Sequence, residues 1–239
     1  RQPRVAILST GDELRDMDDP NVPGSIVNSN AYALAAMVRE AGCEPVVLPN
    51  VRDDLEAIVA ALRVGLGADV LLTIGGVSVG DYDFVKTAFD CVGIAADFWK
   101  VRIKPGKPLI FARAGTTPVV GLPGNPMSTM VTFEALVRPG LRAMTGDPKP
   151  HRLRHDVFLA ADHRHALGRL ELARARITIE SGRLVATPLK LQGSGSVTSW
   201  IDVDALLLLP EDRATFAAGE KVSAILVRDD TGSARSPFD

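Results

Sequence analysis

The stretch DVLLTIGGVSVGDYD, residues 69–83, decides the fold. Its first half is an apolar run that is polar only near its ends, and such a run predicts a strand buried on both faces. The glycine-rich half that follows predicts a loop at the carboxyl end of that strand. This stretch therefore predicts one unit of a parallel sheet covered by helices.

Segments on both sides of residues 69–83 repeat the same alternation of apolar strand and amphipathic helix. Strands are predicted at residues 4–8, 45–48, 69–74 and 119–120. Helices are predicted at residues 30–41, after a cap at Asp53 or Asp54, and at 127–144. Apolar strands separated by amphipathic helices are typical of a doubly wound, three-layer α/β domain with a parallel sheet. We assign residues 1–147 to that domain.

The pattern changes at the proline-containing segment 146–150, beyond which no helical period is visible. Short strands are predicted instead, at residues 169–174, 184–189, 205–210 and 222–227. A proline-rich break between two periodicities is typical of a domain boundary. Residues 148–239 are therefore predicted to form a small, barrel-like all-β domain.

Composition excludes several classes of protein. The chain has 239 residues, of which 46% are hydrophobic and 23% charged, as in globular proteins. A net charge of -2 argues against nucleic-acid binding. No apolar run reaches the roughly 20 residues of a membrane span, and no signal peptide is visible, so we predict a cytoplasmic protein. Two cysteines, Cys43 and Cys91, are too few for a disulfide framework and are expected to be buried.

Four predicted loops follow strands of the first domain. In parallel sheets these loops gather at the carboxyl ends of the strands, which is the edge where ligands bind. The loops have the sequences STGDEL (9–14), VRDD (51–54), GGVSVGDYD (75–83) and GLPGNP (121–126). Glycines and backbone N–H groups suit a phosphate. The carboxylates of Glu13, Asp53, Asp81 and Asp83 suit Mg²⁺, which prefers oxygen ligands. Lys104 and Lys107, on the segment IKPGKP, are candidate anion ligands.

Each of these residues also has a structural interpretation. Gly75 and Gly76 alone form a tight turn, an aspartate can cap a helix, and Asn125-Pro126 can start one. Single lysines are usually solvated. The arginines of the second domain, at positions 152, 154, 164, 169, 174 and 176, are more typical of a solvated β face than of a phosphate site. His163 and His165 share one face of an extended segment, but no carboxylate pattern beside them indicates a metal site.

The motifs together resemble a known family. STGDEL, RDD, GGVSVGDYD, IKPGKP and GLPGNPMS occur in the order found in molybdopterin molybdenumtransferases of the MoeA and gephyrin E-domain type. The later QGSGS (192–196) and AGEKVSAILV (218–227) are similar to the C-terminal β domain of that family. The resemblance implies a molybdopterin-binding fold that inserts molybdenum from molybdate into adenylylated molybdopterin and releases AMP, assisted by Mg²⁺.

The resemblance also implies roles for single residues. Glu13, Asp53 and Asp83 match the acidic active-site positions, and Asp53 and Asp83 are the implied metal ligands. The residues that match positions binding the pterin and its phosphate are Gly75, Gly76, Ser78, Lys104, Lys107, Pro123, Asn125 and Pro126.

The family's N-terminal domains, which contribute to its homodimer, have no counterpart in this sequence. The chain is therefore expected to be a fragment or a shortened relative. Two alternative functions follow: a non-catalytic module that binds molybdopterin or partners, and the related adenylyltransferase. The adenylyltransferase is less favoured because its single-domain members lack the β domain.

Overall fold

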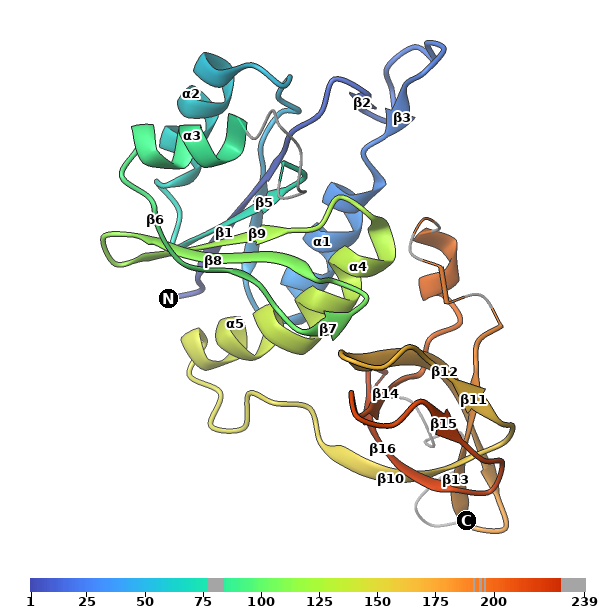
Figure 1. Ribbon diagram of the computed structural model, residues 1–239. Helices are drawn as coiled ribbons and strands as arrows, with labels where there is room; N and C mark the ends of the chain where they lie inside the picture. Colours follow the sequence, from blue (N-terminus) through green and yellow to red (C-terminus); the bar gives the residue numbers. More distant parts are fainter. Residues whose placement is uncertain (77–83, 191, 194, 196, 229–239) are drawn as a thin grey trace. The chain divides into compact units, whose positions relative to one another are not determined.

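The computed structural model describes residues 1–76, 84–190, 192–193, 195 and 197–228 (Figure 1). The chain divides into two compact units. The first comprises residues 1–101 and 106–150, and the second comprises residues 102–105 and 151–239. The short segment Arg102–Pro105 thus belongs to the second unit, although it lies far from the rest of that unit in sequence. None of the helices in the described part of the chain is long and apolar enough to cross a membrane.

The first unit is built on one six-stranded sheet with the order β4-β1-β5-β9-β8-β6. Its strands are β1 (Arg4–Ser9), β4 (Glu44–Val47), β5 (Val70–Ile74), β6 (Ala95–Lys100), β8 (Pro108–Ala114) and β9 (Thr117–Leu122). β4, β1, β5 and β9 are parallel, but β8 and β6 are antiparallel to their neighbours. The expectation of a fully parallel sheet is wrong at this edge. A tight turn at Gly115, with φ +58°, joins β8 directly to β9 and forces them to run in opposite directions.

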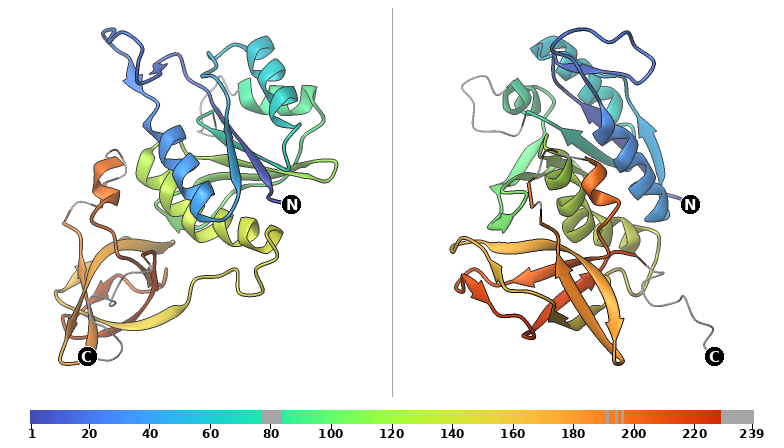
Figure 2. Two further views of the ribbon diagram at one scale, coloured as in Figure 1. Left: turned by 180° about the vertical axis from the view of Figure 1, so that it is seen from behind. Right: turned by 90° about the vertical axis from the view of Figure 1, so that its right-hand side faces the viewer.

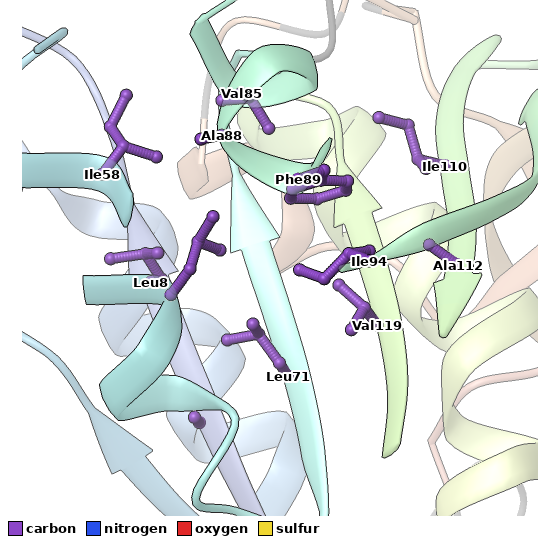
Figure 3. Close-up of a cluster of buried hydrophobic side chains, with 12 residues drawn as sticks. Leu8, Ile58, Leu71, Val85, Ala88, Phe89, Ile94, Ile110, Ala112 and Val119 are labelled. Carbon is purple, nitrogen blue, oxygen red and sulfur yellow. The ribbon is translucent and has the colours of Figure 1, made fainter. Parts of the chain in front are cut away.

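Helices cover both faces of this sheet, as Figures 1 and 2 show. α2 (Leu55–Gly65) and α3 (Phe84–Cys91) lie on one face, and α1 (Ser29–Glu40), α4 (Pro126–Thr132) and α5 (Arg138–Met144) lie on the other. In Figure 3, Leu8 and Leu71 of the sheet pack with Ile58 of α2 and Phe89 of α3. The three-layer, doubly wound prediction is confirmed.

Two helix starts are fixed by side-chain caps. The Asn28 side chain accepts a hydrogen bond from the Ala31 N–H at 3.2 Å, and Asp54 accepts one from Ala57 at 2.9 Å. Of the two aspartates that could cap α2, Asp54 is therefore the cap, since a side-chain oxygen at this position pairs with an N–H that has no partner within the helix. Asp53 lies one residue earlier, in the loop.

The helix predicted over residues 127–144 is interrupted. After α4 the backbone forms a π-helical segment, Phe133–Val137, before α5 continues to Met144. Pro139 lacks an N–H and cannot donate to the turn before it, and π-type segments commonly absorb such a defect. The Arg138 N–H bonds to the Phe133 carbonyl, five residues back.

Other elements differ less from expectation. β2 (Leu14–Arg15) and β3 (Ile26–Val27) pair with each other. Cys43 is buried, as expected, whereas Cys91, at the end of α3, is exposed.

The second unit is a small β structure with a closed core. Its main strands are β10 (Arg154–Leu159), β12 (Leu170–Glu180), β13 (Arg183–Pro188), β14 (Ala205–Leu209) and β16 (Lys221–Leu226). They follow the order β13-β10-β16-β14-β12, and β12 also pairs with β13, which closes a five-stranded barrel. The interior holds apolar residues such as Val157, Ala173 and Leu207. The prediction of a barrel-like all-β domain is confirmed.

Three short strands and one turn complete the second unit. β7 (Ile103–Lys104) pairs in parallel with β12. β11 (His163–Arg164) pairs with β15 (Thr215–Phe216), and a single 3-10 turn, η2, covers Val197–Trp200. β7 is the part of this unit that comes from residues 102–105, so the lysine segment predicted from sequence is part of the β structure.

Candidate functional site

The loops after β1, β4, β5 and β9 are hydrogen-bonded to one another at one edge of the first sheet. The backbone bonds between them are Thr10 N to Ile74 O at 3.1 Å, Gly11 N to Val51 O at 3.0 Å, and Gly75 N to Leu122 O at 3.3 Å. Each bond joins one of these loops to a neighbouring loop or to the last residue of a neighbouring strand, so the four loops lie side by side at this edge. This is the edge where ligands bind in doubly wound sheets.

The turn after β5 requires glycine at two successive positions. Gly75 and Gly76 have φ values of +88° and +64°, a region that other residues rarely adopt. A Cβ atom on Gly75 would lie 2.7 Å from the carbonyl oxygen of Thr10, and one on Gly76 would lie 2.1 Å from a methyl group of Val85. The backbone at this turn is therefore packed as closely as glycine allows. Ser78 lies outside the described residues.

Three carboxylates gather on the loops beside this turn, and we call Asp12, Glu13 and Asp53 the acidic cluster. The Asp53 N–H donates to Asp12 Oδ1 at 3.2 Å. Partial burial raises the pKa of Asp53 above its ordinary value, and the negative charges of Asp12 and Glu13 raise it further. The Glu13 carboxylate folds back over Gly11, where an added Cβ would lie 2.5 Å from Oε2. Like charges held this close favour the arrival of a cation.

The geometry of a metal site is not complete within the residues described. Among residues 1–76, 84–190 and the described part beyond, no group of three or more His, Cys, Asp or Glu side chains is placed to hold a metal ion. Asp83, predicted with Asp53 to bind Mg²⁺, lies outside the described residues. The oxygen donors of the acidic cluster match the chemistry of Mg²⁺, and the ion itself stays a prediction.

The turn after β9 lies against the glycine turn. A Cβ added to Gly124 would meet the Cα of Gly75 at 3.8 Å, and the Gly124 carbonyl accepts a hydrogen bond from Asn30 Nδ2 at 2.7 Å. Asn125 is the N-cap of α4 and Pro126 its first residue, as the structural interpretation predicted. The Asn125 side chain makes no capping hydrogen bond, however. The Pro123 carbonyl accepts a hydrogen bond from the buried Thr129 hydroxyl.

The two predicted lysines belong to different units. Lys107 lies in the first unit, where its carbonyl accepts a hydrogen bond from the Val101 N–H at 3.1 Å. Lys104 lies on β7 in the second unit, and its Nζ is 3.1 Å from Glu171 Oε1. Sequence analysis treated these lysines as a pair on one loop. The structure gives them separate surroundings, with Lys104 anchored to the barrel.

Sequence analysis missed two buried charged residues on β12. Arg174 was expected on a solvated face, and this is wrong because its side chain is fully buried. It donates hydrogen bonds to Ser199 Oγ and the Gly193 carbonyl, both at 2.8 Å, so the segment that follows β13 covers it. The loss of solvent lowers the pKa of Arg174. Glu171 is the second such residue, and no local sequence pattern marks it.

Known families match both units. The family described as "Probable molybdopterin binding domain" matches residues 6–143, and "MoeA C-terminal region (domain IV)" matches residues 156–227. The first match covers more than half of the chain and includes all four loops of the sheet edge. The fold and this edge therefore define a molybdopterin-binding domain followed by a MoeA-type β domain.

Named relatives are similar over nearly all of the chain. A molybdopterin molybdenumtransferase of Bacillus subtilis is 36% identical over 98% of this chain and 54% of its own length. Molybdopterin molybdenumtransferase 2 of Mycobacterium tuberculosis is 36% identical over 92% of this chain and 55% of its own. The solved structure of a MoeA protein from Pyrococcus horikoshii has a TM-score of 0.80 at 30% identity, covering 95% of this chain and 55% of its own. The chain belongs to the family of probable molybdopterin binding domains, carries a region that matches the MoeA C-terminal domain, and spans about half the length of these relatives.

Proposed function

We propose that this chain acts in molybdenum cofactor biosynthesis as the part of a molybdopterin molybdenumtransferase that binds adenylylated molybdopterin. Molybdate supplies the metal, and AMP is the second product. The observation that carries this proposal is the connected edge of four loops, with the acidic cluster next to the glycine turn. The named relatives support it, because the chain is similar to them across both units.

In this proposal different loops of the first unit bind different parts of the adenylylated molybdopterin. The closely packed turn at Gly75 and Gly76 lets a phosphate approach the backbone, and Ser78 adds a hydroxyl donor. Pro123, Asn125 and Pro126 would contact the pterin from the turn after β9. The Asn125 side chain does not cap α4, so its amide suits a polar group of the pterin.

Asp53 and Asp83 would hold Mg²⁺, with Glu13 assisting. When bound, the ion would neutralise charge on the phosphoanhydride that joins pterin and AMP. Without it, Asp12, Glu13 and Asp53 would repel a phosphate as they repel one another. Partial burial is the largest cause of the raised pKa of Asp53, and the charges of Asp12 and Glu13 raise it further. Lys104 and Lys107 would each donate to an oxyanion, molybdate or phosphate.

The test is release of AMP by this chain from adenylylated molybdopterin in the presence of molybdate and Mg²⁺. We expect molybdate-dependent release, and we expect Asp53→Asn to reduce it by about 100-fold or more, as loss of a metal ligand usually does. Asp54→Ser is the matched control, because it changes the neighbouring aspartate but keeps a capping oxygen for α2. Asp83→Asn should behave as Asp53→Asn does.

Two outcomes would contradict the proposal. Near-normal release by Asp53→Asn would remove this residue from the site. Tight binding of the pterin without any AMP release would indicate a binding module instead of a catalyst. A homodimer of the full-length form and a cytoplasmic location belong to the same proposal, and sedimentation of the full-length protein tests the dimer.

A further inference from the structure

A buried carboxylate in the second unit faces three basic side chains. Glu171 lies on β12, and its side chain is 3% exposed. Its Oε1 is 3.1 Å from Lys104 Nζ, and its Oε2 is 3.7 Å from His163 Nε2 and 3.4 Å from His165 Nδ1. A carboxylate this deeply buried is costly unless it is paired. The three bases therefore explain how Glu171 can be accommodated.

The backbone holds Lys104 in register with Glu171. β7 pairs with β12 so that Lys104 lies opposite Glu171, and the Leu170 N–H donates to the Arg102 carbonyl at 3.0 Å. Lys104 is thus held at two points. Its backbone is paired with β12, and its ammonium group is paired with the Glu171 carboxylate. Its side chain is still 36% exposed. An ammonium has three N–H donors, so one bond to Glu171 leaves donors for a ligand in solvent.

The histidines close the far side of the carboxylate. The side chains of His163 and His165 are 10% and 0% exposed, and His165 stacks on Phe216 with ring centroids 5.8 Å apart. Arg213 covers the Phe216 ring and pairs with Glu220. Lys104 and His163 hold the pKa of Glu171 below its ordinary value, against the opposing effect of burial. Glu171 is therefore a charged partner for Lys104 at neutral pH.

We propose that Glu171 is a positioning residue that holds the Lys104 ammonium ready for an oxyanion ligand. This rests on the proposed function, in which Lys104 binds phosphate or molybdate. A free lysine side chain loses rotamer freedom when it binds a ligand, and this loss weakens binding. Glu171 orders this side chain in advance.

The first experiment measures, without any ligand, how strongly Glu171 holds the Lys104 ammonium group. Trace acetylation of the intact protein, read by mass spectrometry, reports how available each lysine amine is. We expect Glu171→Gln to raise the acetylation rate of Lys104 by about tenfold or more, because it removes one charge-assisted hydrogen bond. Lys107 in the same protein is the internal reference and should not change. Glu171→Asp keeps the charge but shortens the reach, so its rate should lie between the two.

The second experiment measures binding, with molybdate as the probe in calorimetry at pH 7. Glu171→Gln should weaken molybdate binding about three- to tenfold. The double variant with Lys104→Gln should bind no more weakly than Lys104→Gln alone, because Glu171 acts through Lys104. A purely structural role would instead lower stability and leave this coupling at zero. If Glu171→Gln unfolds, the Glu171→Asp protein supplies both comparisons.

The outcomes distinguish the ion pair between Glu171 and Lys104 from the role of Glu171 in positioning Lys104 for a ligand. An unchanged Lys104 acetylation rate in both Glu171 variants would show that Glu171 does not hold the Lys104 ammonium group. A raised rate with unchanged molybdate affinity would overturn the positioning role. If the wild-type chain binds no molybdate while the acetylation rates shift as expected, the proposed ligand is wrong and the positioning role is wrong with it, although the ion pair remains established.

Discussion

The acidic cluster of the first unit and Glu171 of the second contain the same chemical group in opposite circumstances. Asp53 has other carboxylates as neighbours, and its pKa is raised. Glu171 is buried more deeply but has Lys104 and His163 as neighbours, and its pKa is lowered. Burial pushes both values upward, so the sign of the difference comes from neighbouring charge. The acidic cluster has uncompensated charge that favours a cation, whereas the charge of Glu171 is compensated by a side chain of the fold itself.

The largest effect expected from this comparison is on the stability of the second unit. Glu171→Gln removes a buried charge that compensates Lys104, and breaking such pairs costs about 3–5 kcal/mol when both partners are buried. Because Lys104 can still reach water, we expect a loss of about 2 kcal/mol in the free energy of unfolding. Urea denaturation measures this. Glu220→Gln, which breaks an exposed pair with Arg213, is the control and should change stability far less.

The contribution of the Glu171–Lys104 pair to the free energy of unfolding should depend on pH in a defined direction. The folded-state pKa of Glu171 is below its ordinary value, so its contribution is fully present above the ordinary glutamate pKa, about 4.3. It is lost as pH falls through the lowered folded-state pKa. The difference in stability between wild type and Glu171→Gln should therefore shrink as pH falls below about 4. A difference that grew on acidification would contradict the assigned sign.

Mg²⁺ should affect only the first of the two carboxylate clusters. If the acidic cluster takes part in the proposed metal site, saturating Mg²⁺ stabilises the folded protein, by about 1.4 kcal/mol at tenfold excess over the dissociation constant. Thermal unfolding with and without the ion measures the effect. Asp53→Asn should lose it and Glu171→Gln should keep it. Equal stabilisation of wild type and Asp53→Asn would exclude Asp53 as a ligand.

The smallest effect is a gain of stability without any metal. Asp53 has a raised folded-state pKa, so its ionised form destabilises the fold above that pKa, and this penalty disappears below the ordinary aspartate pKa, about 3.9. Asp53→Asn should therefore raise stability at pH 7, by only about 0.3 kcal/mol because the residue is exposed and screened. Asp54→Asn, which retains the cap, should not. A loss of stability in Asp53→Asn would contradict the destabilising effect assigned to the ionised carboxylate.

The sequence predicted what depends on local pattern. The apolar strands and the glycine turn placed the four loops at one edge, and either Asp53 or Asp54 was predicted to cap the helix that follows. The capping hydrogen bond was needed to show which of them caps α2. The antiparallel β8 was missed because the hairpin at Gly115 changes the strand direction without changing the hydrophobic pattern.

Charges that pair over long separations could not be predicted in this way. Glu171 and Lys104 are far apart in sequence, and only the pairing of β7 with β12 brings them together. Arg174 alternates with small apolar residues as an outward-facing strand residue would. Its burial comes from a later segment that covers the outer face of β12. Both residues depend on register and on loop path, which single-sequence patterns do not contain.

The four residues Arg102–Pro105 have a consequence for how this chain can be cut or recombined. The polypeptide enters the second unit, leaves it and returns after residue 150, so this unit is not encoded by one continuous stretch, although the five strands of its barrel are. A gene fragment for residues 151–239 would encode β12 with an unpaired edge where β7 normally lies, and Glu171 without its lysine. Exposed edges of this kind promote aggregation. The two units therefore pack separately, but one short strand of the second is encoded within the sequence of the first.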